Sequence, residues 1–332
     1  MIVKDEELAL PRVLKVAPIF ADEIIIVDTG STDRTIELAE KAGCKVYHFD
    51  WINDFAAARN YSLSLGTGDY LMWLDADDII TPERAQMIAS LKRSLTADVV
   101  MLPYHMGNPP SLVFWRERII KRNMGLQFKG KVHEAIEVRG NVIYENIPVV
   151  HDKLKQSDPK RNLKLFEEIL AQNGDFTGRE AFYYGSELYY NGINDKADLY
   201  LRKFLKQSGS PADKGQAALY LSCIQESTQE KRKVLIEGLS FVFSPDLLCA
   251  LGDSYLNSNN YHHAKACYLT ALAADETITF KNPDCSGYLP HIRLCYCYWY
   301  LDDRKKAKLH NDAALKIKPD DKYALTNAKL FN

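Results

Sequence analysis

The pattern of apolar and polar positions changes character near residue 150. Before that point, short apolar runs typical of strands alternate with segments of helical period. The pattern predicts strands at 24–27, 45–49, 70–74 and 98–102, and helices at 35–42, 54–65 and 82–95. A very short apolar run at 1–3 predicts a first strand. Strands alternating with helices of this length indicate a parallel, right-handed βαβ sheet covered on both faces.

Residues 112–150 follow a different pattern, with shorter extended pieces separated by charged residues. They predict a mixed or antiparallel extension of the sheet. The polar stretch 152–162 contains Pro159 and is expected to be a linker. We therefore expect an α/β domain over 1–155 and a second, all-α domain over 163–332, where the helical period continues almost to the end.

The helical half contains an internal repeat of small and aromatic residues. Its clearest copy carries Leu251, Gly252, Tyr255, Ala264, Tyr268 and Ala271, and a second carries Leu294, Tyr298, Ala307, Ala314 and Pro319. A weaker copy holds Gly185 and Ala197, and one around 216–240 is degenerate. These spacings are those of the tetratricopeptide helix pair, in which small residues let two helices approach. Three to four such pairs predict a short α-solenoid, with a plain helical bundle as the alternative.

Composition excludes several classes of protein. An apolar content of 46% and a charged content of 26% are ordinary for a globular protein. The formal net charge of −2 does not support nucleic-acid binding. We find neither an apolar stretch long enough to span a membrane nor a signal-peptide pattern. The seven cysteines lack C-x-x-C spacing and are interpreted as reduced core thiols of a cytoplasmic protein.

Three carboxylates follow directly after the apolar run at 70–74. Asp75, Asp77 and Asp78 would lie at the carboxyl edge of the sheet, where open α/β sheets bind ligands. Mn²⁺ and Mg²⁺ prefer carboxylate oxygens together with substrate phosphates, so the run suggests a metal–diphosphate site. The alternative is a solvated turn or a helix cap. Thr81 and Pro82 already supply a good helix start, however, and leave the aspartates without that role.

Several motifs in order resemble those of the family-2, GT-A-fold glycosyltransferases with a tetratricopeptide-like tail. The motifs are Met1–Glu7, Val27–Asp33, Ala58–Asn60, Gly68–Asp78, Phe128–Glu134 and Val149–His151. The branch includes enzymes that glycosylate bacteriocin peptides. The resemblance implies a Rossmann-like, mostly parallel sheet followed by all-α repeats. It also implies a metal-dependent, inverting transfer that uses Mn²⁺ or Mg²⁺ and a nucleotide-sugar donor, with a UDP-sugar expected first.

Two features depart from this family. Asp5 stands where relatives usually have Asn, which affects a loop without obviously removing a ligand. The first strand is shorter than usual, so the amino terminus is expected to be trimmed relative to its relatives. In the family, that strand normally forms one side of the nucleobase site.

The donor site is assigned partly from chemistry and partly from the resemblance. Asp28 ends a predicted strand, where its oxygens can accept hydrogen bonds from a ribose hydroxyl or a base. Arg59 is interpreted either as a partner of the diphosphate or of a site carboxylate, or as a solvated helix cation. By resemblance, the donor would also be bound by Val3, Lys4, Asp75, Arg118 and His133.

The same resemblance suggests metal ligands and a base. Asp77 would bind the metal, and His151 would either complete its shell or simply pack beside its strand. Asp75 and Asp77 are expected to share one face, and Asp78 to point away as a turn or cap residue. Glu134 is the candidate general base, because an inverting transfer needs a carboxylate near the acceptor nucleophile. His133 would orient Glu134 or a phosphate.

The predicted repeats suggest a platform rather than part of the chemistry. We interpret them as holding a peptide or protein acceptor, or a second copy of the chain in a homodimer. Other relatives act on surface polysaccharide or lipid-linked acceptors, which stays an alternative. A contrasting class is a non-catalytic tetratricopeptide scaffold with a degenerate sheet domain. The joint presence of the candidate site residues argues against that class.

Overall fold

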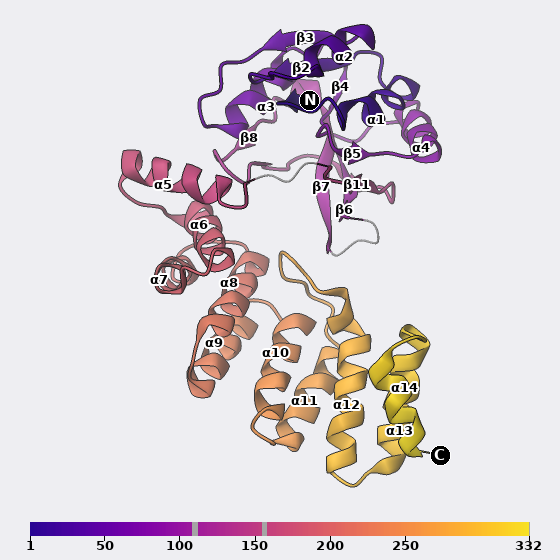
Figure 1. Cartoon of the computed structure of the whole chain (residues 1–332), viewed down its shortest axis with the longest axis vertical. Coiled ribbons are helices and arrows are strands. Elements are labelled where there is room, and N and C mark those ends of the chain that lie inside the picture. Colours follow the sequence, from indigo (N-terminus) through magenta and orange to yellow (C-terminus); the bar gives the residue numbers. More distant parts are fainter. Residues whose placement is uncertain (108–111, 155–157, 332) are drawn as a thin grey trace. The chain divides into compact units, whose positions relative to one another are not determined.

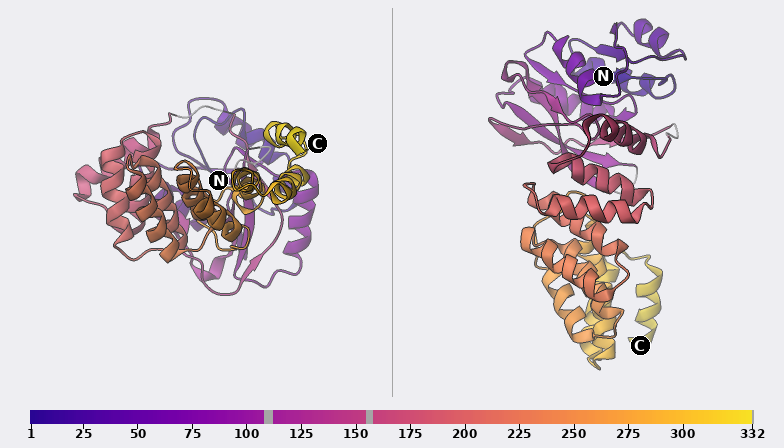
Figure 2. Two further views of the ribbon diagram at one scale, coloured as in Figure 1. Left: turned by 90° about the horizontal axis from the view of Figure 1, so that it is seen from below. Right: turned by 90° about the vertical axis from the view of Figure 1, so that its left-hand side faces the viewer.

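The computed structural model describes residues 1–107, 112–154 and 158–331, which form two compact units (Figures 1 and 2). The first unit covers Met1–Phe166 and the second Glu167–Asn332. Residues 155–157 of the predicted linker lie outside the described part, and helix α5 (Arg161–Asn173) begins just before the linker's expected end.

The N-terminal unit contains a parallel three-stranded sheet and a mixed six-stranded sheet. The parallel sheet runs in the order β1 (Ile2–Val3), β2 (Ile25–Asp28) and β3 (Lys45–His48). The mixed sheet has the order β4 (Tyr70–Met72), β7 (Leu112–Lys121), β6 (Val99–Met106), β11 (Val149–His151) and β5 (Asp78–Ile79), and β10 (Val142–Tyr144) also pairs with β6. A separate hairpin joins β8 (Phe128–Lys129) to β9 (Ala135–Ile136).

Helices and short 3₁₀ turns connect these strands. They are α1 (Leu10–Leu14), η1 (Ala17–Ile19), α2 (Thr35–Lys41), α3 (Phe55–Ser64), α4 (Pro82–Lys92) and η2 (Arg122–Met124). Helix α4 begins as expected, with the Thr81 side chain accepting from the Arg84 amide and Pro82 in the first turn. Helix α3 is capped by Asp54, which accepts from the Ala57 amide.

The strands and helices predicted before residue 106 are present, but their pairing differs from one parallel sheet. Strand β4 pairs antiparallel with β7, and β5 is a further strand that pairs antiparallel with β11. The extended pieces predicted between 112 and 121 are one long strand, β7, antiparallel to β6. The expected mixed extension of the sheet is therefore confirmed, and it also includes β4 and β5, which come earlier in the chain than expected.

The C-terminal unit consists of helix pairs. They are α6 (Gly178–Tyr190) with α7 (Asn194–Leu205), α8 (Pro211–Ile224) with α9 (Thr228–Phe241), α10 (Pro245–Leu256) with α11 (Tyr261–Ala271), and α12 (Tyr288–Tyr300) with α13 (Arg304–Ile317), followed by α14 (Lys322–Ala328). Two short 3₁₀ turns complete the unit, η3 (Pro283–Ser286) and η4 (Lys329–Phe331).

These helices stack as tetratricopeptide-like repeats. Each helix contacts its neighbours in the chain, and the first helix of each pair contacts the first helix of the next. Such nearest-neighbour packing is that of a solenoid rather than of a plain bundle. In the clearest repeat, a Cβ on Gly252 would lie 2.6 Å from the Tyr268 ring, so glycine is needed for this close approach. Within the described residues, no helix is long and apolar enough to cross a membrane.

Candidate active site

Arg59 links two carboxylates that are far apart in the sequence. It lies on α3, and its Nη2 is 2.7 Å from Asp75 Oδ1 while its Nε is 2.6 Å from Glu134 Oε1. The guanidinium also lies over the Trp73 ring, 4.8 Å from its centroid. The solvated-cation interpretation of Arg59 is therefore wrong, because only 11% of its side chain is exposed.

The electrostatics of this cluster follow from burial and opposite charge. Burial disfavours the charged form of Asp75, but Arg59 and then Arg118 outweigh it and hold the pKa of Asp75 well below its usual range. Burial likewise opposes the charge on Arg59, but Asp75 and Glu134 raise the pKa of Arg59 above its usual value. Asp75 and Arg59 are therefore both charged at neutral pH.

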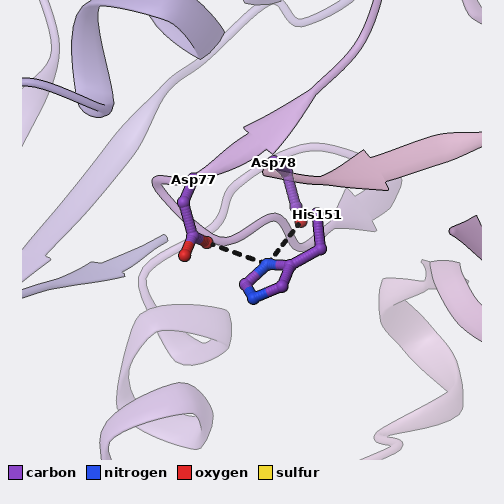
Figure 3. Close-up of side chains that lie close together, drawn as sticks. All are labelled: Asp77, Asp78 and His151. Atoms are coloured by element: carbon purple, nitrogen blue, oxygen red, sulfur yellow. Dashed lines mark ion pairs between the residues drawn. The ribbon is translucent and has the colours of Figure 1, made fainter. Parts of the chain in front are cut away.

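A second cluster brings together Asp77, Asp78 and His151 (Figure 3). His151 Nδ1 is 3.2 Å from Asp77 Oδ1 and 3.9 Å from Asp78 Oδ1. Burial alone would lower the pKa of His151, but the two carboxylates outweigh it and raise the pKa to about 10. Each residue offers one ligand atom, and these atoms lie within 4.8 Å of one another.

This cluster passes a simple test for a divalent cation. His151 Nδ1 is buried and faces the carboxylates of Asp77 and Asp78, but among the described residues it makes no hydrogen bond of good angular geometry. Carboxylate oxygens and an imidazole nitrogen are suitable ligands for Mn²⁺. A buried ring nitrogen whose nearest groups are two carboxylate oxygens is placed where the three residues could share a cation.

Asp78 does not point away as a turn or cap residue on the surface. It is fully buried, and its carboxylate binds Arg118 Nη1 at 2.9 Å, the Tyr104 hydroxyl at 2.8 Å and the Asp75 amide at 2.9 Å. The expected alternation of faces fails because β4 ends at Met72 and the acidic run turns, with the Asp78 amide donating to the Asp75 carbonyl. Asp75 therefore faces Arg59, while Asp77 and Asp78 face His151.

Arg118, which the resemblance places at the donor, is buried beside Asp78. Its side chain is 0% exposed and lies over the rings of Trp73 and Tyr104, at 4.0 and 4.2 Å. Burial opposes its charge, but Asp78 raises the pKa of Arg118 above its usual value. In this structure Arg118 forms a buried ion pair with Asp78, and its side chain does not reach the surface where a diphosphate could contact it.

The residues predicted near the nucleotide occupy the ends of β1 and β2. Asp28 is buried and closes its own turn, because its carboxylate accepts from the amides of Gly30 and Ser31. The Val3 side chain is in the core, and its carbonyl accepts from the Thr29 amide and hydroxyl, whereas Lys4 is exposed. These residues are adjacent in the parallel sheet, where Val3 pairs with Asp28.

The turn after Asp28 is bound to the turn that follows β1. The Ser31 hydroxyl accepts from the Asp5 amide, and the Thr32 amide donates to the Asp5 carboxylate at 2.7 Å. Asp33 accepts from the Thr35 amide in the first turn of α2. The turn after β2 is therefore bound to the turn after β1, rather than serving only as a helix cap.

A cavity of about 880 Å³ lies between β2 and β4, with Ile25, Tyr70 and Arg59 among its lining residues. Asp75, Asp77, Glu134 and His151 do not line it. The cavity is therefore lined by Arg59 but is separate from the acidic cluster.

The 128–134 segment carries Glu134 and His133 to the site. Both Gly130 and His133 have positive φ, +94° and +53°, which bends the segment sharply. Glu134 points to Arg59, and its carbonyl accepts from Arg116 Nη2 at 3.3 Å. The His133 ring stacks on Phe166 at 6.4 Å, a contact that the sequence did not suggest.

Comparison with known proteins gives a family match for the N-terminal unit and two similar curated proteins. Residues 1–146 match the model of the family described as Glycosyl transferase family 2. A TPR repeat-containing protein of Synechococcus elongatus is 50% identical over 140 residues, which are 41% of this chain and 34% of that protein. The SPbeta prophage-derived glycosyltransferase SunS of Bacillus subtilis is 27% identical over 218 residues, 61% of this chain and 51% of that protein.

A solved structure, the crystal structure of MamA, overlaps 54% of this chain and 99% of its own, with 15% identity and a TM-score of 0.39. The chain spans about a third to a half of the length of the two curated relatives.

Proposed function

We propose that this chain, whose N-terminal unit is a glycosyl transferase family 2 domain, transfers a sugar from a nucleotide-diphosphate donor to an acceptor with inversion at the anomeric carbon. The observation that carries the proposal is the bridge from Asp75 through Arg59 to Glu134. It holds a candidate donor-binding carboxylate and a candidate base on opposite sides of one buried cation.

In this proposal Glu134 acts as the general base. It would accept the proton from the acceptor nucleophile as the new glycosidic bond forms and the bond to the diphosphate breaks. Arg59 orients Glu134, because its Nε lies 2.6 Å from Glu134 Oε1. Asp75, oriented by the other end of the same guanidinium, would accept a hydrogen bond from the sugar nucleotide.

Asp77 and His151, with Asp78 behind them, would hold a divalent cation, Mn²⁺ or Mg²⁺. When bound, the cation supplies charge neutralisation for the leaving diphosphate. Asp78 also forms an ion pair with Arg118 and accepts a hydrogen bond from Tyr104, so we assign it the role of fixing the positions of the other two ligands. Asp28 and the backbone near Val3 and Lys4 would bind the nucleoside, for which a UDP-sugar is the first choice.

Calorimetry with UDP, with and without Mn²⁺, tests the assignment of Asp77. Asp77→Ala should abolish the Mn²⁺-dependent part of UDP binding and leave the far-UV circular dichroism unchanged. Asp50→Ala is the matched control, because the Asp50 side chain is 96% exposed and forms an ion pair with His48, outside the acidic cluster. Equal Mn²⁺-dependent affinities in the wild type and Asp77→Ala would falsify the metal assignment.

We further propose a peptide or protein acceptor held by the repeats. The support is the set of exposed tyrosines on the C-terminal unit, Tyr190, Tyr296, Tyr300 and Tyr323, which are 46–76% exposed. Aromatic side chains supply large contact areas for extended peptides. Replacing these four by Ser should leave hydrolysis of UDP-glucose intact and reduce glucose transfer to a library of Cys- and Ser-containing peptides. Equal loss of both activities would mean that the repeats only brace the catalytic domain.

A further inference from the structure

The hairpin that carries Glu134 is too short to be stable by itself. Strands β8 and β9 have two residues each, with Phe128 opposite Ile136 and Lys129 opposite Ala135. Residues 130–134 form its tip, and Glu134 is the last of them. Even longer isolated hairpins are marginal in water, so the position of Glu134 depends on groups outside the hairpin.

Asn60 binds the outer edge of β8. Its amide Nδ2 donates to the Phe128 carbonyl at 3.0 Å, and its Oδ1 accepts from the Phe128 amide at 2.8 Å. A side-chain amide has the same donor and acceptor as a peptide group, so Asn60 acts here as a neighbouring strand would. It lies on α3 directly after Arg59, which binds the Glu134 carboxylate.

Glu117 binds the opposite edge at the same level of the hairpin. Its Oε1 accepts from the Ile136 amide at 3.2 Å, and the Glu117 side chain is 6% exposed. Arg116 pairs with Glu117 at 3.3 Å and also donates to the Glu134 carbonyl at 3.3 Å. In an antiparallel pair, non-hydrogen-bonded positions direct their backbone groups outward, and Phe128 and Ile136 present these groups to Asn60 and Glu117.

We propose that Asn60 and Glu117 are positioning residues that clamp the hairpin from both edges and so fix Glu134 for proton abstraction. This inference rests on the proposed role of Glu134 as base. Both anchors belong to elements that carry other site residues, since α3 carries Arg59 and β7 carries Arg118. The position of Glu134 is thereby fixed relative to Arg59 and the acidic cluster.

Removing an anchor should displace Glu134 without removing it. A shift of about 1 Å at a reacting group costs on the order of 10²-fold in rate. We therefore expect Asn60→Ala and Glu117→Met, which removes the acceptor for the Ile136 amide, to lower kcat for Mn²⁺-dependent UDP-glucose hydrolysis by roughly 10- to 100-fold, with KM changed less than about 3-fold. Asn60→Asp keeps the acceptor for the Phe128 amide and should lose less activity than Asn60→Ala.

A double-variant cycle separates positioning from general destabilisation. If Asn60 acts through Glu134, adding Asn60→Ala to Glu134→Gln should change the residual rate less than about 3-fold. Full additivity of the two losses would overturn the proposal. Glu137→Gln is the control on the same hairpin, because the Glu137–Lys129 ion pair is 77% and 72% exposed, and it should be near wild type.

Hydrogen exchange tests the clamp independently of activity. In Asn60→Ala, exchange should accelerate at least about tenfold in peptides covering 128–136 and stay unchanged in β6. Unchanged exchange over 128–136 overturns the clamp. A wild-type chain that binds UDP but hydrolyses no UDP-glucose would count against the proposed function, while the exchange result would still decide the clamp. If Asn60→Ala accelerates exchange in β6 as well, Asn60→Asp and Glu117→Met replace it as the deciding variants.

Discussion

Arg118 offers a direct test of how the acidic cluster is supported. Its side chain and that of Asp78 are both 0% exposed, and their ion pair measures 2.9 Å. Arg118→Met keeps most of the buried stem and can still contact the rings of Trp73 and Tyr104. It leaves the Asp78 carboxylate buried without its cation.

The size of the effect follows from this burial. Removing one partner of a buried ion pair costs about 3–5 kcal/mol, because the remaining charge is desolvated and unpaired. Asp78 keeps hydrogen bonds from Tyr104 and from the Asp75 amide, so we expect the lower end of that range. With a urea m-value of about 2 kcal/mol/M, the unfolding midpoint should fall by about 1.5 M.

Tryptophan fluorescence can follow the N-terminal unit selectively. Trp51, Trp73 and Trp115 belong to it, and Trp299 is the remaining tryptophan of the chain, so a Trp299→Phe background confines the signal to this unit. The control is Arg122→Met, because Arg122 is exposed and donates to the Gly68 carbonyl, and we expect a change within about 0.5 kcal/mol.

The double variant Asp78→Asn with Arg118→Met decides whether charge is the cause. It removes both charges together, so stability should recover to within about 1.5 kcal/mol of wild type. If Arg118→Met behaves like Arg122→Met, or if the double variant is no more stable than Arg118→Met, the reasoning from buried charge is refuted.

Two further predictions concern the base and the repeats. Glu134→Gln keeps size and hydrogen bonding but removes basicity, so UDP binding should survive while transfer and UDP-glucose hydrolysis fall by roughly 10²–10⁴-fold; a near wild-type rate would place the base elsewhere. Burial, with a smaller contribution from His291, lowers the pKa of His310 to about 4; the two Nδ1 atoms are 2.9 Å apart. The stability that comes from keeping His310 neutral is therefore present at pH 7 and is lost as the pH falls from about 6.5 towards 4. The free energy of unfolding, followed by circular dichroism, should fall between pH 7 and pH 5 by roughly 1–2 kcal/mol less in His310→Asn than in the wild type. His262→Asn, at an exposed position, is the control and should behave like the wild type. An unchanged pH dependence in His310→Asn would contradict the assignment.

Local signals in the sequence accounted for most individual elements. The start of α4 at Thr81 and Pro82 was readable because caps and helix starts depend on neighbouring residues. The repeat at Gly252 and Tyr268 was equally readable, since spacing within a helix pair sets which side chains meet. The grouping of Asp77 with His151 was also suggested, although only by resemblance to a family.

Contacts between distant segments decided the rest. Whether β4 pairs in parallel or antiparallel depends on β7, more than 40 residues later, and no local pattern specifies that partner. The burial of Asp78 and Arg118 was not predicted, because charged side chains usually stay in water. It is possible because folding pairs the two side chains with each other. The same holds for Asn60 and Glu117, whose roles exist only because folding brings the Glu134 hairpin between them. The sequence by itself thus determined the elements and the candidate chemistry, while the tertiary structure decided which charges are buried together and what holds the base in place.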